Sequence, residues 1–178
     1  MKIEAITNYI CEVCGHTEED RKSVEYHEKL CWEEVKAHLD FGHLKLGQII
    51  QKCSDLLEAY QELPVIIVQE QDGQEINLGL AGMEGSYRGY YRDLAIEPIT
   101  DRSNRRWENW KFSLKDFHQR MIRAARSSYS GWKGGEFWMS RDTWVWVSEV
   151  GAADQLAVVD IRLAPAHKSI QVVVKEFP

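Results

Sequence analysis

The chain has 178 residues, of which 44 % are hydrophobic, and its formal net charge is −6 at pH 7. This length and hydrophobic content allow one proper core plus a small appendage. No apolar stretch approaches the ~20 residues needed to span a bilayer, which argues against a membrane protein and for an ordinary soluble, cytoplasmic one.

Four residues near the N-terminus have metal-ligand spacing: Cys11, Cys14, His27 and Cys31, in the pattern Cys-x2-Cys-x12-His-x3-Cys. The first gap lets two thiolates on a tight turn reach one ion. The last gap places His27 and Cys31 on the same side of one helical turn. Four nitrogen and sulfur ligands with no open position predict a closed, tetrahedral, structural Zn²⁺ site.

Two alternatives to this ligand set remain. His16, two residues after Cys14, is a rival to His27. Four unconnected side chains are the other alternative, but several independent spacings agree with a metal site. A set of disulfides is disfavoured by the odd pairing and by the lack of a signal peptide.

The charge of this finger argues against DNA binding. Residues 1–40 contain ten acidic and five basic side chains, a net charge of −5. A finger that enters the major groove needs a basic face, and this one would be repelled by phosphate. The sequence therefore predicts a finger that caps the fold or contacts a protein.

The rest of the chain alternates between helical and strand patterns. After a hinge at 38–43, apolar residues recur at helical spacing over 45–62, and Pro64 ends that helix. The further predicted elements are strands at 65–68, 76–80 and 90–97, a helix from Ser113 to about 128 with a capping arrangement, and strands at 136–139, 144–147, 156–163 and 170–174. The strands at 136–139 and 144–147 are expected to form a hairpin. This order predicts a finger module over 1–40 and an α+β domain over 41–178, with a mainly antiparallel sheet and two packing helices.

The segment 82–142 differs in charge from the rest. It contains twelve basic and eight acidic side chains, a net charge of +4, and eleven of the nineteen aromatic residues. Arg and Lys bind phosphate, aromatic rings stack on bases, and glycine exposes backbone N–H groups. This combination predicts a nucleotide site.

Two motifs in this segment, at 85–94 and 132–137, provide most of the candidate ligand residues. Arg88, Arg92 and Lys133 are candidates for phosphate contacts, and Tyr87, Tyr91 and Trp132 for ring stacking. The ligand set is completed by Gly134, Gly135 and Arg141. A hairpin loop with packed tyrosines and a turn that leads into a strand are the structural alternatives, and neither motif is a Walker or Rossmann pattern.

The sequence offers no convincing catalytic set. Cys53 lies on an apolar helical face and is predicted to be a buried thiol, and no pair of carboxylates is marked as acid and base. The predicted zinc site is closed, so it lacks the open position that a zinc hydrolase needs. Binding without turnover is therefore the prediction.

Three blocks of the sequence resemble a family of small bacteriophage proteins over roughly residues 44–162. The first runs from Leu46-Gly47-Gln48-Ile49-Ile50 to Leu63-Pro64, and the second is Ser86-Tyr87-Arg88-Gly89-Tyr90-Tyr91-x-Asp93-Leu94-Ala95-Ile96-Glu97-Pro98. The third is Trp132-Lys133-Gly134-Gly135-Glu136-Phe137-Trp138-Met139 followed by Asp142-Thr143-Trp144-Val145-Trp146-Val147. The family is similar to the phage sponges that counter Thoeris defence.

The resemblance implies a protein of the infected bacterial cytoplasm that binds cyclic ADP-ribose-type signals or cyclic oligonucleotides without cleaving them. The chain departs from the family in its finger, in Trp144 where a proline is expected, and in the basic stretch 101–109, which looks inserted.

The assembly and the rival functions are also predicted from the sequence. A small α+β unit has little enclosed volume, so we expect a homodimer or a higher even-numbered oligomer with pockets between subunits. The alternative function is an adaptor or regulator in which the finger binds nucleic acid or a host protein. A nucleotide-processing enzyme is the third possibility.

Overall fold

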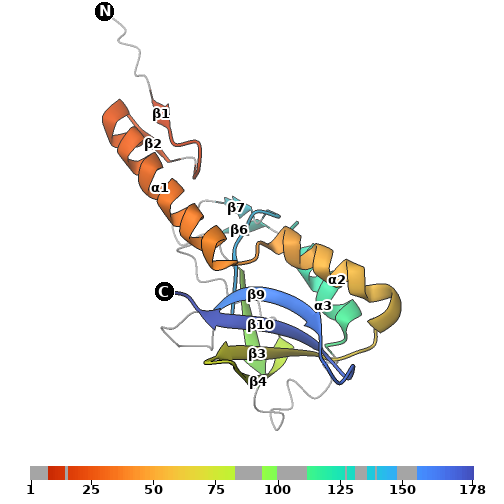
Figure 1. Ribbon diagram of the computed structural model, residues 1–178. Coiled ribbons are helices and arrows are strands. Elements are labelled where there is room, and N and C mark those ends of the chain that lie inside the picture. The colour runs from red at the N-terminus through yellow and green to blue at the C-terminus, as the bar shows by residue number, and fades with distance from the viewer. Residues whose placement is uncertain are drawn as a thin grey trace, which may run out of the picture. The chain divides into compact units, whose positions relative to one another are not determined.

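The structure is a computed structural model that describes residues 8–14, 16–82, 94–99, 112–126, 128–130, 136–138, 140–147 and 156–178 (Figure 1). The chain divides into two compact units, Met1–Gly42 and His43–Pro178. Each unit has its own packing and is described by itself.

The N-terminal unit is a short hairpin followed by one helix. Strands β1 (Tyr9–Ile10) and β2 (Thr17–Glu18) pair antiparallel, and α1 spans Arg21–Phe41. The Asp20 carboxylate caps α1 by accepting a hydrogen bond from the Ser23 N–H at 3.0 Å. The helix ends where Gly42 takes a left-handed conformation, φ 78°, so the segment predicted as a hinge is largely the last turn of α1.

The second unit contains two helices and eight strands among its described residues. They are α2 (Leu46–Tyr60), β3 (Val65–Gln71), β4 (Gln74–Gly82), β5 (Leu94–Ile99), α3 (Leu114–Ala124), β6 (Ser128–Ser130), β7 (Glu136–Trp138), β8 (Val145–Val147), β9 (Leu156–Leu163) and β10 (Ile170–Glu176). Helices α2 and α3 lie side by side and pack together (Figure 1). The α+β class predicted from the sequence is therefore confirmed.

Six of these strands close into a barrel rather than forming the open sheet that the sequence led us to expect. The strand order is β10-β3-β4-β5-β8-β9, and β9 pairs with β10 again. Four of the joints are antiparallel, whereas β5 with β8 and β10 with β3 are parallel. The barrel thus consists of two antiparallel three-stranded halves, β3-β4-β5 and β8-β9-β10, joined by two parallel seams.

Aliphatic side chains fill the barrel and the space beneath its helices. Residues buried to 2 % exposure or less include Val65, Ile67, Leu94, Ile96, Val145, Val158, Ile170 and Val172. From the helices, Leu46, Ile49, Phe117 and Met121 join the same core. The small barrel is a packed core, as expected for six strands.

The predicted hairpin between 136–139 and 144–147 is wrong. Strand β7 pairs with β6, while β8 pairs with β5 on one side and with β9 on the other. Both edges of β8 are thus paired with strands other than β7, and all three of its residues are buried in the barrel. None of the helices in the described ranges is long and apolar enough to cross a membrane.

Candidate functional site

Cys11, Cys14, His27 and Cys31 come together in the N-terminal unit. One potential ligand atom from each lies within 4.8 Å of all the others. The His27 Nε2 atom is 3.1 Å from the Cys14 Sγ and 3.4 Å from the Cys31 Sγ. Three sulfurs and one imidazole nitrogen in this arrangement are positioned to hold a metal ion.

Two elements position these ligands. Cys11 and Cys14 lie in the turn between β1 and β2, and the Cys11 N–H donates to the His16 carbonyl at 2.8 Å, which closes that turn. His27 and Cys31 are one turn apart on α1. Val24 is 4 % exposed on the same helix and packs within the unit. The predicted spacing and the observed geometry agree.

The thiols of the group differ in acidity. Burial and the neighbouring thiol of Cys14 raise the pKa of Cys31 to about 12. Burial also opposes ionisation of Cys11, but hydrogen bonds from the backbone of Cys14 and Val13 outweigh it and lower the pKa of that thiol. Ligation requires thiolates, so a bound cation would supply the charge that this cluster needs to ionise fully.

The rival ligand and the remaining cysteine lie outside the group. His16 is an exposed side chain whose Nε2 lies 2.9 Å from the Glu18 carboxylate, and its ring is 4.5 Å from that of His27. Cys53 is fully buried in the barrel unit, as predicted, and burial raises its pKa to about 12. Such a thiol is inert toward metals and electrophiles.

Of the predicted ligand residues, only Arg141 lies within the described part of the chain. The others lie outside it: Tyr87, Arg88, Tyr91, Arg92, Trp132, Lys133, Gly134 and Gly135. Arg141 is exposed in the turn before β8. Its guanidinium forms no ion pair within the described ranges.

The parallel seam between β5 and β8 defines the barrel edge at which Arg141 lies. Leu94 is in register with Val145, and the Leu94 N–H donates to the Trp144 carbonyl at 3.0 Å. Leu94 is the last residue of the first motif, and Arg141 lies four residues after the end of the second. Because parallel strands begin at the same edge, the chain leaves the first motif beside the turn that carries Arg141.

The start of α2 is attached to this turn. The N–H groups of Leu46 and Gly47 donate to the carbonyls of Thr143 and Arg141, both at 2.8 Å. The Lys45 ammonium lies 5.0 Å from the centre of the Trp144 ring and 3.6 Å from the Asp142 carboxylate. We refer to Lys45, Arg141, Asp142 and Trp144 as the α2 edge.

Lys45 was not among the residues predicted from the sequence to bind ligand. The sequence does contain a signal for Lys45, because it stands at the first position of a predicted helix, where Ser, Thr, Asp or Asn is favoured. Trp144 was noted only as a replacement for proline. The contact between the two residues becomes visible only when the parallel seam is known.

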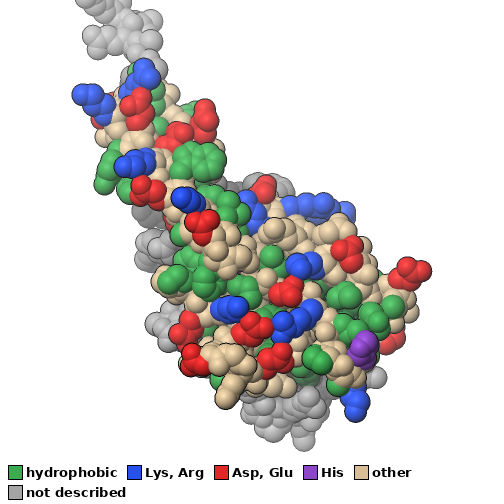
Figure 2. Space-filling view, viewed as in Figure 1, with side chains coloured by type: hydrophobic (Ala, Val, Ile, Leu, Met, Phe, Trp, Pro, Cys, Tyr) green, Lys and Arg blue, Asp and Glu red, His purple; other side chains and the backbone are tan. Residues whose placement is uncertain are grey.

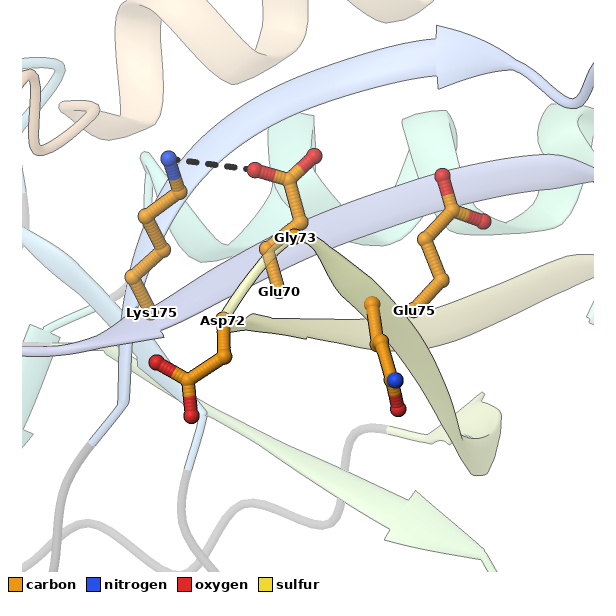
Figure 3. Close-up of a pocket in the computed structure, with 6 residues that line it drawn as sticks. Glu70, Asp72, Gly73, Glu75 and Lys175 are labelled. Atoms are coloured by element: carbon orange, nitrogen blue, oxygen red, sulfur yellow. Dashed lines mark ion pairs between the residues drawn. The ribbon is translucent and has the colours of Figure 1, made fainter.

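A shallow depression of about 480 Å³ lies at the β3–β4 turn and is lined by acidic side chains (Figure 3). Glu70 pairs with Lys175 at 3.0 Å and with Arg162 at 3.0 Å, and Arg162 also pairs with Glu75 at 2.6 Å. Lys175 and Arg162 lower the pKa of Glu70. Since these carboxylates are occupied by basic partners, the cluster links strands and is not a ligand site.

A scan against protein-family models found no match, and searches of curated proteins and of solved structures found none either. The fold and the Cys/His group therefore define the class: an α+β protein with a closed six-stranded barrel and an N-terminal group able to hold a metal ion.

Proposed function

We propose that the protein binds and sequesters a cyclic nucleotide signal, such as a cyclic ADP-ribose derivative or a cyclic oligonucleotide, without cleaving it. In this proposal it is a phage protein that acts in the cytoplasm of the infected bacterium by withdrawing an immune second messenger. The proposal combines the resemblance of the sequence blocks with one structural observation, the β5–β8 seam.

The seam supports the proposal because it brings the end of the first motif beside the start of β8. Leu94 begins β5 where the first motif ends, and its neighbour across the seam is Val145, just after Arg141 and Trp144. A nucleotide offers phosphate to cations and a ring to an aromatic side chain. The α2 edge supplies two cations, Lys45 and Arg141, beside the end of the first motif, and the tyrosines and the tryptophan of the two motifs are the candidates for the ring.

We further propose that the metal is Zn²⁺ and that its role is structural. Three thiolates and an imidazole suit zinc, and four protein ligands leave no position for a substrate or a water. The metal would stabilise the N-terminal unit, whose described hairpin and helix offer few apolar residues for a core.

The direct test is to incubate the purified chain with cyclic ADP-ribose, its derivatives and cyclic oligonucleotides, remove free ligand, denature the protein and analyse the released ligand by chromatography. Recovery of an intact nucleotide in fixed proportion to the protein supports sequestration. Recovery of an altered nucleotide, with many turnovers per chain, overturns it in favour of an enzyme. Retention of no nucleotide overturns it as well.

The adaptor function remains the alternative, and the surface of the N-terminal unit favours a protein over a nucleic acid as its partner. Tyr26, Leu30, Trp32 and Leu39 of α1 are 45–65 % exposed, among many acidic side chains (Figure 2). Exposed apolar groups typically contact proteins. If this alternative holds, the wild-type chain should retain no nucleotide, and substitution of Trp32 and Leu39 by serine should abolish its association with the partner protein.

A further inference from the structure

The starts of α2 and α3 are attached to the barrel in the same way. Each helix begins against the start of a strand that lies in a parallel seam, β8 for α2 and β3 for α3. Each residue at the α2 start has a counterpart at the α3 start, and the difference in residue number is the same for every pair. A second constant difference relates the residues at the start of β8 to their counterparts at the start of β3. Three hydrogen bonds at the α2 start each have a counterpart at the α3 start. Leu46 N–H donates to Thr143 O as Leu114 N–H donates to Leu63 O, and Gly47 N–H donates to Arg141 O as Lys115 N–H donates to Gln61 O. In the opposite direction, Val145 N–H donates to Leu44 O as Val65 N–H donates to Phe112 O.

The same relation extends to the bridges and to the seams. Lys45 bridges Trp144 as Ser113 bridges Pro64, both antiparallel. The Ile170 N–H donates to the Pro64 carbonyl at 2.9 Å, as Leu94 does to Trp144. The unit therefore has an internal two-fold relation, with each half made of a helix and three antiparallel strands. Residues at matched positions share a backbone environment, so differences between their side chains need another explanation.

Position by position, the α3 start has a favourable N-cap side chain, whereas the α2 start has only the other half of a capping box, in which the Gln48 side chain accepts a hydrogen bond from the Lys45 N–H at 2.8 Å. The Ser113 side chain accepts a hydrogen bond from the Asp116 N–H at 3.2 Å, which is an ordinary N-cap. Its counterpart is Lys45, whose ammonium has no acceptor atom and carries a positive charge at the positive end of a helix dipole. Residues that oppose local stability without a structural gain typically serve function.

The second difference concerns Gly47, whose counterpart is Lys115. A Cβ atom at position 47 would lie 3.0 Å from the Arg141 Cβ and 3.1 Å from the Arg141 carbonyl oxygen. A lysine is accommodated at the matched position, so the backbone alone does not require glycine. Glycine is required at position 47 because Arg141 lies so close to it. Glycine is otherwise unfavourable inside a helix.

The side chains at the α2 edge have complementary chemistry. Arg141 is exposed, and the Lys45 side chain is 30 % exposed above the Trp144 ring. The Asp142 carboxylate that pairs with Lys45 is 85 % exposed, so water competes for it and an incoming anion can replace it at little cost. The backbone N–H groups of Leu46 and Gly47 are already bonded to carbonyls and are not available to a ligand.

We propose that Lys45 and Arg141 form a subsite for a phosphate group of the nucleotide, with Gly47 as the residue that positions Arg141. This inference rests on the proposed function and deepens it. The phosphate binds between the two cations, displacing Asp142 from Lys45, while the Trp144 ring keeps its contacts with His43 and with the Lys45 ammonium. The α3 start, with Ser113, Pro64 and Lys115, is the structural counterpart without a ligand role.

The test uses the full chain with cyclic ADP-ribose as the probe, calorimetric titration for affinity and thermal unfolding for stability. Lys45→Ser restores a capping residue, so its Tm should equal or exceed that of the wild type, while the affinity falls by about tenfold or more. Lys115→Ser removes the same charge at the matched joint and should leave the affinity within about twofold. Loss of stability and affinity together in Lys45→Ser would contradict the inference, because it would make the lysine a structural residue.

The role of Gly47 is tested by a double-mutant cycle with Arg141→Ala. Gly47→Ala should weaken binding by about tenfold in the wild-type background and have no further effect in the Arg141→Ala background, because it acts through that residue. Equal losses in both backgrounds overturn the positioning role. Wild-type affinity in Lys45→Ser overturns the subsite but leaves the proposed function intact, whereas a wild-type chain that binds no nucleotide overturns both.

Discussion

His27 lies within reach of two thiols, which makes it the residue on which the metal group depends. Its Nε2 atom is 3.1 Å from Cys14 and 3.4 Å from Cys31, while His16 is held by Glu18. The two histidines are therefore a matched pair, one inside the group and one outside it. Substituting each histidine in turn therefore distinguishes the loss of a metal ligand from a general effect of removing an imidazole.

We predict that His27→Ala loses its tightly bound metal and that His16→Ala keeps one Zn²⁺ per chain. Loss of one of four ligands opens the site, and metal affinity falls steeply because binding and folding are coupled in such small units. Elemental analysis of protein purified without chelators provides the measurement. Full metal content in His27→Ala, with loss in His16→Ala, would reverse the assignment.

His43 has a structural role in the barrel unit. It is 2 % exposed, its Nε2 lies 2.7 Å from the Val145 carbonyl, and its ring contacts those of Trp144, Trp146 and Phe177. The short distance to a carbonyl requires this nitrogen to carry the proton and donate it. One side chain thus joins the chain before α2 to β8 and to the C-terminal residues.

We predict that His43→Ala lowers the free energy of unfolding by about 2–4 kcal/mol, since it removes a buried ring and leaves a carbonyl without its donor. His43→Phe keeps the ring but not the donor, so about 1–2 kcal/mol of that loss should remain. Urea unfolding followed by tryptophan fluorescence measures both. A phenylalanine variant as stable as the wild type would show that the hydrogen bond contributes nothing.

At the scale of elements, the polar network at the β3–β4 turn links four strands. Glu70 of β3 pairs with Lys175 of β10 and with Arg162 of β9, and Arg162 reaches Glu75 of β4. Gln171, 5 % exposed, donates to Glu75 at 2.9 Å. The network spans the β10–β3 seam, where the strands come from distant parts of the sequence.

This network should make the barrel sensitive to acid. The lowered pKa of Glu70 means that its ionised form stabilises the fold above the ordinary glutamate value, and that this contribution disappears as pH falls through the lowered value. We predict that Glu70→Gln costs about 0.5–1 kcal/mol at pH 7 and almost nothing once the pH lies well below the lowered pKa of Glu70. Asp72→Asn, at the exposed turn with φ 51°, is the matched control and should change little at either pH. Equal effects of Glu70→Gln at both pH values would exclude an ionic contribution.

Local patterns in the sequence predicted the elements but not the closure of the barrel. The apolar repeat before Pro64 and the Ser113–Asp116 pair define α2 and α3, because capping and helical periodicity act within a few residues. Pairing of β10 with β3 joins residues more than 100 positions apart, and no local pattern encodes it. The same holds for Lys45, whose role emerges only from comparison of the two helix starts.

At the scale of the whole molecule, the two units should respond independently to loss of metal. The barrel core is built entirely from residues of its own unit. Removal of the metal by a strong chelator, or the substitution Cys14→Ala, should therefore unfold the finger region at about 8–34 and leave the barrel folded. Tryptic cleavage after Lys22 and Lys29 should accelerate, while the tryptophan fluorescence of the barrel stays unchanged. Collapse of both signals together would show that the finger is required for the barrel.

The last prediction concerns assembly. Side chains fill the barrel interior, and the α2 edge is an exposed surface in the described structure, so neither encloses a ligand. Pockets usually bury most of the surface of the molecule they bind, and in symmetric oligomers a second copy often provides the missing wall. We therefore predict a homodimer or a higher even-numbered oligomer in which each pocket takes residues from two chains. Light scattering of a monomer that still binds cyclic ADP-ribose tightly would contradict this.

Mixing of two inactive variants tests the shared pocket directly. Suppose that Lys45 of one subunit and Arg88 of the other contact the same ligand. A mixed dimer of Lys45→Ser and Arg88→Ala then has one pocket with both residues intact and one with both removed. At a ligand concentration too low to occupy either variant alone, random exchange of subunits should restore about a quarter of the wild-type binding sites. If both residues came from the same chain, every pocket in the mixture would lack one of them and no binding would return. The restored fraction therefore distinguishes a pocket built between subunits from one built within a single barrel.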